Sequence, residues 1–298
     1  MNQQAFALVL CAGLIHAIWN IVAKKAGGDA RFACFTNLIM MLVWAPAGIY
    51  YGWDEVPRWS ALEWGFIAAS GVVHVFYFVT LLRGYRKADL TVVYPMARGS
   101  APLISSFAAL FILNEHISVL GCLGIAGVVG GVLLIAGGPH LFRGVLRAGQ
   151  PELKRRQIRK GLYYGLLTGL FIAAYTVIDG YAVKVILISP LLMYYFCNFF
   201  QIALLLPALW RNPEQTKLMW RAQWKHAVIV ATVSPLSYIL VLIAMQSAPL
   251  SHVAPAREVS MLFAALIGGQ LLNEGDRKVR LLGAVCIAAG VLLLGFGR

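Results

Sequence analysis

Charged side chains are scarce in this sequence. Only 12% of the 298 residues are Asp, Glu, Lys or Arg, whereas 60% are hydrophobic and the mean hydropathy is +0.76. A soluble domain usually carries about 25% charged residues. With so few charges, most side chains face lipid or each other. The composition predicts an all-α polytopic membrane protein, and its length leaves no room for a soluble domain.

The sequence also lacks the motifs of several enzyme classes. It has no Walker lysine motif, which excludes an ATP-driven pump in one chain, and neither H-E-x-x-H nor G-x-S-x-G occurs. Its five cysteines form no C-x-x-C pair, so metal and redox sites lack the required spacing. We therefore expect no enzyme, no metal and no cofactor.

The net charge of +13 would suggest a nucleic-acid partner in a soluble protein. Here the basic residues lie between apolar runs, as in the cytoplasmic loops of membrane proteins. We expect the lipid bilayer, and no nucleic acid, as the macromolecular environment.

Apolar runs separated by polar breaks predict ten transmembrane helices in two sets of five. The expected spans are 3–23, 33–52, 62–82, 91–113, 119–137, 161–182, 190–210, 224–245, 251–272 and 279–296. The basic segment 139–160 separates a first repeat, residues 1–138, from a second, residues 161–298.

The two halves of the sequence match when residues 159 positions apart are compared. Arg98 corresponds to Arg257, Asn20 to Asp179, and Asn114–Glu115 to Asn273–Glu274. Because five spans is an odd number, the second copy must enter the membrane inverted, an arrangement typical of secondary transporters. Counting basic loops places 139–160 in the cytoplasm and both termini outside, in a bacterial inner membrane.

Two arginines lie inside expected spans. Arg98 and Arg257 are each roughly 10 Å into the apolar core by helical rise. A charge at that depth must face the bundle interior or water. One interpretation is a cavity in which guanidinium groups hold an anionic moiety. The alternative is an internal ion pair with Glu258 or Asp179 that locks helices together.

Prolines and polar faces accompany these arginines. Pro95 and Pro255 precede them, where each frees a backbone carbonyl for a substrate or a moving gate, or makes a static kink. His16 and Asn20 share one helix face, as do Tyr175 and Asp179. Both faces are expected to line one cavity, with interhelical hydrogen bonding as the alternative.

The pattern resembles the ten-helix EamA-type branch of the drug/metabolite transporter superfamily. The resemblance rests on residues 16–20 with Lys24, residues 91–99, residues 113–115, residues 172–180 and residues 254–258. It implies a basket of helices in which the first, third, fourth, sixth, eighth and ninth frame a central cavity. Members that this resembles export amino acids and related metabolites, and others move drugs, nucleotide sugars or sugar-linked lipids.

The expected function is a secondary transporter that exports small polar metabolites, such as amino acids or related organic anions, by alternating access. The alternatives are a flippase for a lipid-linked sugar or phosphate, multidrug efflux, and a membrane scaffold. We expect a monomer or homodimer, with protons as candidate coupling ion and Asp179, Glu258 and His16 as candidate carriers. The expected substrate-binding residues are Trp19, Asn20, His74, Tyr94, Arg98, Tyr175, Asp179, Tyr238, Arg257 and Glu258.

Overall fold

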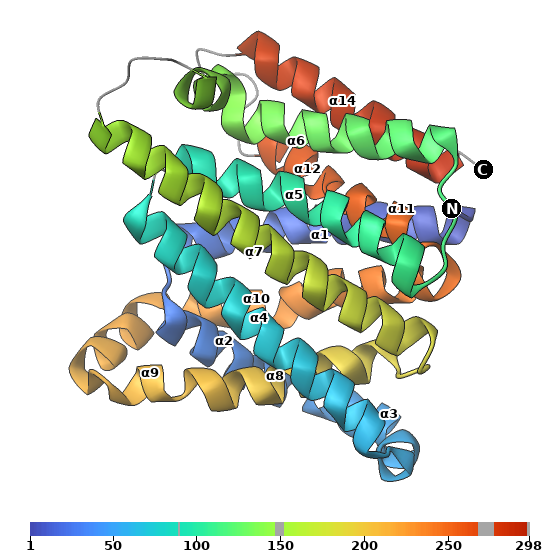
Figure 1. Ribbon diagram of the computed structural model, residues 1–298. Coiled ribbons are helices and arrows are strands. Elements are labelled where there is room, and N and C mark those ends of the chain that lie inside the picture. The colour runs from blue at the N-terminus through green and yellow to red at the C-terminus, as the bar shows by residue number, and fades with distance from the viewer. Residues whose placement is uncertain (89, 147–151, 268–276, 297–298) are drawn as a thin grey trace.

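The computed structural model describes the chain except residues 89, 147–151, 268–276 and 297–298. All regular structure within the described ranges is helical, as predicted (Figure 1). The elements are α1 (Gln3–Ala26), α2 (Ala30–Val43), α3 (Ala45–Glu55), the 3₁₀ turn η1 (Val56–Arg58), α4 (Ala61–Lys87), α5 (Leu90–Ile112), α6 (Val119–Leu146), α7 (Glu152–Lys184), α8 (Pro190–Leu205), α9 (Pro207–Trp210), α10 (Pro213–Ser247), α11 (Leu250–Ala256), α12 (Val259–Ile267) and α14 (Arg277–Phe296).

Local sequence signals set several helix ends. Ser60 and Glu63 form a capping box that starts α4, in which each side chain satisfies the other's backbone N–H. The end of α1 is closed by Gly27 at φ 62°, a conformation that glycine adopts without a steric penalty. Pro46 has no N–H to offer the carbonyl of Leu42, and the chain bends by 65° between α2 and α3.

Among the described residues, eight helical segments are long and apolar enough to cross a membrane, and the bent α2–α3 pair makes nine. The chain is therefore a multi-pass membrane protein. The remaining expected span is α5, which lies in the bundle between α6 and α7. Because α5 is not among the segments that meet this length and hydropathy criterion, the number of ten spans stays a prediction.

Several boundaries differ from the sequence-based expectation. The segment expected as a linker, 139–160, is largely helical, because α6 runs on to Leu146 and α7 begins at Glu152. The seventh expected span is divided at Leu206, ahead of Pro207, and the ninth is divided between α11 and α12. The end of that ninth span and Asn273–Glu274 lie outside the described residues.

The helices of the two halves pack reciprocally. Helix α1 lies along α10, and α4 lies along α7; likewise α2 packs on α10, and α8 packs on α4. The last helices of the halves, α6 and α14, lie side by side at the top of Figure 1. Each half thus completes its packing only against the other.

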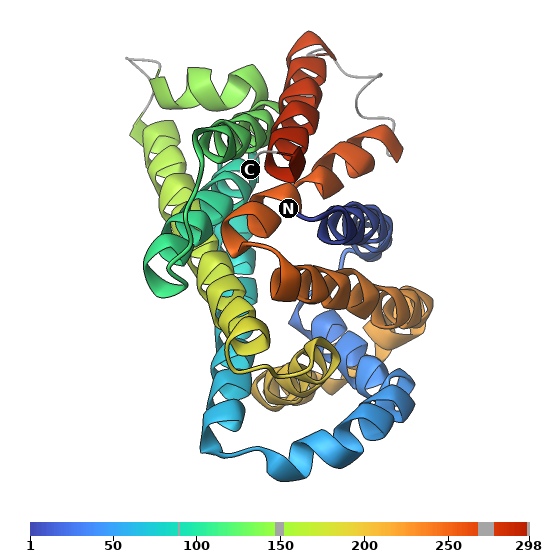
Figure 2. The ribbon, with the colours of Figure 1, turned by 90° about the vertical axis from the view of Figure 1, so that its right-hand side faces the viewer.

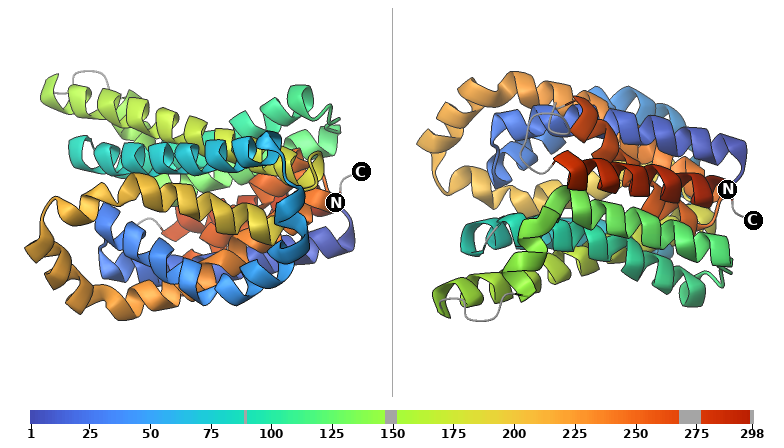
Figure 3. Two further views of the ribbon diagram at one scale, coloured as in Figure 1. Left: turned by 90° about the horizontal axis from the view of Figure 1, so that it is seen from below. Right: turned by 90° about the horizontal axis from the view of Figure 1, so that it is seen from above.

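Met1 and the end of α14 lie together at one end of the bundle (Figures 2 and 3). The amino group of Met1 donates to the carbonyl oxygens of Leu294 and Gly295, at 3.4 and 3.1 Å. The starts of α7 and α10 lie at the opposite end (Figure 3). A chain that begins and ends on the same side crosses an even number of times, which favours ten crossings over nine.

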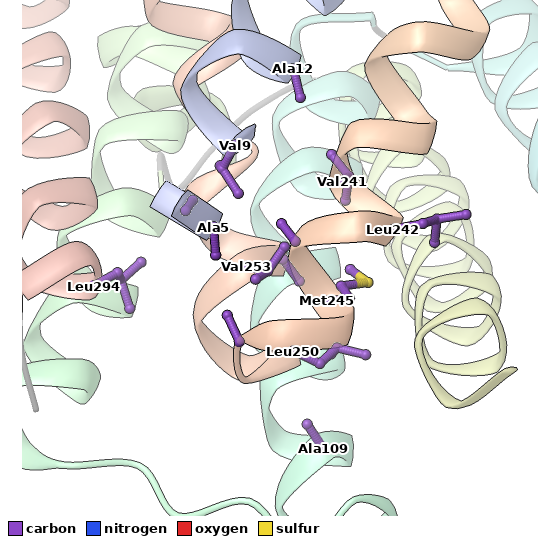
Figure 4. Close-up of a cluster of buried hydrophobic side chains, with 14 of the residues drawn as sticks. Ala5, Val9, Ala12, Ala109, Val241, Leu242, Met245, Leu250, Val253 and Leu294 are labelled. Atoms are coloured by element: carbon purple, nitrogen blue, oxygen red, sulfur yellow. The ribbon is translucent and has the colours of Figure 1, made fainter. Parts of the chain in front are cut away.

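A buried apolar cluster holds α11 in place (Figure 4). Leu250 and Val253 of α11 pack with Val9 of α1, Met245 of α10 and Leu294 of α14. Every residue of α11 is buried, although the helix has only seven residues. The core therefore fixes the segment that leads directly to Arg257.

Candidate functional site

The helix that carries Arg257 is interrupted at that residue. Helix α11 ends at Ala256 and α12 begins at Val259. Between them the N–H of Glu258 bonds the carbonyl of Pro255 at 3.0 Å, three residues back instead of the four of an α-helix. Pro255 has no backbone N–H, so it cannot donate the usual helical hydrogen bond to the carbonyl of Ser251. That carbonyl instead accepts a hydrogen bond from Ser106 Oγ of α5 at 3.0 Å. The break is thus stabilised by the neighbouring helix, and it turns two charged side chains toward the interior.

Arg98 and Glu258 form an ion pair inside the bundle. Arg98 Nη2 lies 3.1 Å from Glu258 Oε2 and 3.4 Å from Ser260 Oγ. Arg98 Nε is also buried and has no hydrogen-bond partner among the described residues. One guanidinium edge is therefore occupied by protein, while a further donor remains available to a ligand.

A narrow pocket adjoins this ion pair, with free space for about one water molecule. Its wall is formed by α1, α5, α10 and the break between α11 and α12, and it includes His16, Arg98, Ser237, Arg257 and Glu258. His16 Nδ1 lies 3.4 Å from Ser237 Oγ. Two guanidinium groups, one carboxylate and two small hydroxyls thus surround one narrow space, which a small anion would enter only if these side chains moved apart.

Arg257 differs from Arg98 in its partners. Its guanidinium carbon lies 5.2 Å from the ring centroid of Tyr238, within the range of a cation–π contact. It forms no ion pair with a carboxylate in the described part of the chain. The positive charge of Arg257 therefore has no fixed anionic partner beside the cavity.

Asp179 lies on the other side of Tyr238. The Tyr238 hydroxyl donates to Asp179 Oδ2 at 2.5 Å, and Asp179 is 1% exposed. Its second oxygen, Oδ1, is buried without a partner among the described residues. One tyrosine thus touches both a cation and a carboxylate, and the free carboxylate oxygen can accept a hydrogen bond from a ligand.

Aromatic side chains fill the space around Asp179. The His74 ring stacks on Tyr175 with centroids 3.8 Å apart, and Tyr194 lies 5.5 Å from Tyr238. His74 Nδ1 also lies 2.9 Å from the backbone oxygen of Ser70. Four helices, α4, α7, α8 and α10, contribute to this group. Its rings would present apolar faces to the body of a substrate.

Helix α7 reaches this position because it approaches α5 closely. A Cβ atom at Gly169 would lie 3.0 Å from the carbonyl oxygen of Ala97 and would overlap Ser100 Oγ. Only glycine fits there, and the backbones come together one residue before Arg98. The contact places Tyr175 and Asp179 of α7 beside the arginine-bearing segment of α5.

The remaining residues that the sequence predicted for the site lie at different places relative to the pocket beside Arg98 and Arg257. His16 lines the cavity, and its ring lies 4.8 Å from that of Trp19, whose buried Nε1 lacks a partner among the described residues. Tyr94 lies one turn before Arg98 and packs against the main apolar cluster. Asn20 makes no hydrogen bond with a described residue and is half-buried.

Sequence reasoning missed several polar neighbours of the site. Ser70, Ser237 and Ser260 contact His74, His16 and Arg98 respectively, and none was singled out. Glu115 was noticed only as part of the repeat, yet its carboxylate accepts bonds from Lys184, Leu250 and Ser251. Lys184 also corresponds to Lys25 at the offset of 159 that relates the two halves, and this correspondence was the available signal for that contact.

Comparison with known proteins identifies the family. The model of the EamA-like transporter family matches residues 3–137 and residues 159–296. The chain belongs to this family. It is therefore a membrane transporter, as the resemblance had implied.

Individual relatives of this EamA-like transporter are distant. A protein from Sinorhizobium sp described as "Uncharacterized transporter in cobO 3'region" is 24% identical over 140 residues, which are 46% of this chain and 99% of that protein. A solved crystal structure covers 98% of both chains with a TM-score of 0.72 at 13% identity. The latter likeness shows the fold alone.

Proposed function

We propose that this EamA-like transporter is a secondary exporter of small anionic or zwitterionic metabolites, such as amino acids or related organic anions, in a bacterial inner membrane. The observation that carries the proposal is the unequal pairing of the two arginines. Arg98 is balanced by Glu258, whereas Arg257 faces the same cavity without an ionic partner among the described residues.

The charges around the cavity favour a ligand with one negative group. An unbalanced guanidinium in a desolvated site is costly, and a carboxylate that binds it removes that cost through paired, charge-assisted hydrogen bonds. Arg98 Nε supplies one more unused donor beside it. A single carboxylate can therefore engage both arginines without displacing Glu258.

A positive group on the same ligand would find an acceptor at Asp179. Tyr238 contacts Arg257 through the face of its ring and Asp179 through its hydroxyl, so the two opposite charges lie against one side chain. Asp179 Oδ1 has no described partner and can accept from an ammonium group. This arrangement supports zwitterions as well as simple organic anions.

Transport would proceed by alternating access, with rocking of one half against the other. The absence of a Walker motif supports a gradient as energy source, and Asp179, Glu258 and His16 are the candidate proton carriers. We expect the protein to act without enzymatic chemistry, as a monomer or homodimer, with its basic loops in the cytoplasm.

The test is counterflow of labelled amino acids and organic anions in proteoliposomes. Arg257→Gln should weaken binding of the transported anion by about 10- to 100-fold, as expected for loss of a charge-assisted hydrogen bond. Arg257→Lys keeps the positive charge but loses the paired N–H donors of the planar guanidinium group, so we expect an intermediate effect. Arg98→Ala should abolish transport, but it also leaves Glu258 unpaired, so its folding must be checked.

Arg83→Gln is the matched control, because Arg83 is an exposed arginine of α4 outside the cavity. Normal flux in Arg257→Gln would refute the anion site. An absence of flux for every soluble substrate, with movement of a fluorescent anionic lipid, would instead favour the flippase alternative.

A further inference from the structure

The outward face of α10 changes character along its length. In its later turns this face exposes Val228, Ile229 and Leu236, as a lipid-facing helix does. Toward its start, the same stripe continues through Lys225, Arg221 and Lys217, all exposed and spaced by four residues. We call these three residues the α10 basic ridge.

Apolar side chains flank the α10 basic ridge on both sides. Trp220 and Trp224 are 37% and 44% exposed, and Leu218 is 64% exposed. Lys225 Nζ lies 5.7 Å from the Trp224 ring centroid. A purely solvated face would gain nothing from exposing two tryptophans and a leucine, whereas this combination is typical of the membrane interface.

Other side chains of the same segment contact the bundle. Met219 packs against the apolar cluster that includes Phe32, and the Trp220 ring lies 4.9 Å from Phe35 of α2. Gln215 accepts a hydrogen bond from Arg31 at 3.1 Å. The α10 basic ridge is therefore held rigidly, so a ligand need not order it on binding.

The length of α10 places the ridge at headgroup depth. A helix of 35 residues is about 52 Å long, whereas the hydrocarbon core is about 30 Å thick. Val228 and Ile229 begin the exposed apolar stripe, one turn after Lys225. Lys225 thus lies just outside the hydrocarbon on the lipid-facing side of the helix, and Arg221 and Lys217 follow about 6 and 12 Å further along it.

We propose that the α10 basic ridge is a binding site for the phosphate groups of anionic phospholipids in the leaflet at the start of α10. Each cation offers N–H donors to phosphate oxygens, and Trp220 and Trp224 contact the glycerol and upper acyl region. A zwitterionic phospholipid carries its own cation, which the ridge repels, so the site discriminates by net headgroup charge. This site is separate from the central cavity and does not depend on what the protein transports.

The experiment is tryptophan quenching in phosphatidylcholine proteoliposomes doped with brominated phosphatidylglycerol or brominated phosphatidylcholine. In the wild-type protein, the phosphatidylglycerol should quench more strongly, because it collects beside Trp220 and Trp224. The triple variant Lys217→Gln/Arg221→Gln/Lys225→Gln should lose about half or more of that excess, since each basic residue near a membrane surface contributes separately. Added salt should weaken the excess in the wild type.

The matched control is Lys24→Gln/Lys25→Gln/Lys87→Gln, which removes the same charge from exposed positions at the ends of α1 and α4. It should retain the excess. Equal quenching by the two lipids in the wild type, or an equal loss in both triple variants, would overturn the site. If the ridge triple variant fails to fold, Arg221→Gln alone must still reduce the excess.

Discussion

At the residue scale, Tyr238 is the side chain on which the candidate site depends. Its hydroxyl satisfies one oxygen of the buried Asp179, and its ring lies beneath Arg257. A buried carboxylate that loses such a donor bears its desolvation cost alone. The two functions of Tyr238 can be separated, because phenylalanine keeps the ring and removes the hydroxyl.

We expect Tyr238→Phe to lower the free energy of unfolding by about 2 kcal/mol, the usual cost of a lost hydrogen bond to a charged group. Chemical unfolding in detergent measures the change. In an Asp179→Asn background the same substitution should cost clearly less, because the interaction is already weakened. Strict additivity of the two substitutions would show that the hydroxyl and the carboxylate do not interact.

The sequence revealed the charged residues of the site but not their hydroxyl neighbours. Arg98, Arg257 and Asp179 stand out because charges are rare within apolar runs. Ser237 and Ser260 do not, because serines are common in spans and their partners come from distant helices. The partner of Arg98 was among the named alternatives, but choosing Glu258 over Asp179 required the three-dimensional arrangement.

At the element scale, the α6–α14 pair is locked by backbone contact. A Cβ atom at Gly131 would lie 2.5 Å from the carbonyl oxygen of Gly283, too close for any side chain. At the preceding position, Gly130, a Cβ atom would meet nothing within 4 Å. The two neighbouring glycines therefore offer a matched comparison within one helix.

Gly131→Ala should destabilise the protein by about 1–3 kcal/mol through overpacking. Gly130→Ala should leave stability unchanged or raise it by up to about 1 kcal/mol, because alanine favours a helix more than glycine does. Thermal unfolding of the two variants decides between them. Similar effects at both positions would mean that helix propensity, and not the α6–α14 contact, governs this segment.

Glu115, in the connection after α5, ties three elements together. It accepts from the backbone N–H groups of Leu250 and Ser251 at 2.7 and 2.9 Å, and from Lys184 Nζ at 3.0 Å. Burial alone would raise the pKa of Glu115, but the hydrogen bonds from Ser251, Leu250 and Lys184 outweigh it and hold the pKa below the usual 4.5.

A lowered pKa in the folded state makes the ionised Glu115 stabilising. This contribution is complete above the unfolded-state pKa near 4.5 and is lost as pH falls through the lower folded-state pKa. We expect Glu115→Gln to cost about 2 kcal/mol at neutral pH and less at acidic pH. Unfolding midpoints measured across this range should converge for the two proteins; a constant gap would contradict the assignment.

Most helices were predictable, and the exceptions have local causes. Apolar runs located the helices well, because lipid requires every backbone group to be bonded internally. The division of the ninth span escaped prediction, since Pro255 signals only a kink. Whether the helix kinks or breaks there also depends on Ser106 of α5, whose hydroxyl donates a hydrogen bond to the freed carbonyl of Ser251. Similarly, hydropathy marks where lipid begins but not where a helix ends, so α6, α7 and α10 extend beyond their expected limits.

At the scale of the whole molecule, the reciprocal packing of the halves is what an inverted duplication predicts. The contact of α1 with α10 has its counterpart in that of α4 with α7. Arg98 and Arg257, which match in the sequence, approach one cavity from different halves. The inversion itself remains a prediction that depends on the orientation of each half in the membrane.

Topology reporters test that orientation. With basic loops in the cytoplasm, an alkaline phosphatase fused after α14 should be active and a green fluorescent protein fused there should stay dark. The same reporters placed within 147–151, between α6 and α7, should give the reverse result. Identical behaviour at the two sites would require an even number of crossings in the second half, and would refute the five-plus-five arrangement.

The pairing of α6 with α14 also has a consequence for biosynthesis. Helix α14 leaves the ribosome after the other described helices, so the glycine-rich face of α6 has no packing partner until α14 has been made. During that interval the first half cannot settle into its final packing. Nor can the amino group of Met1 reach the carbonyls of Leu294 and Gly295. The packing of α6 is therefore completed only after α14 has been synthesised, and folding of the first half cannot finish before that point.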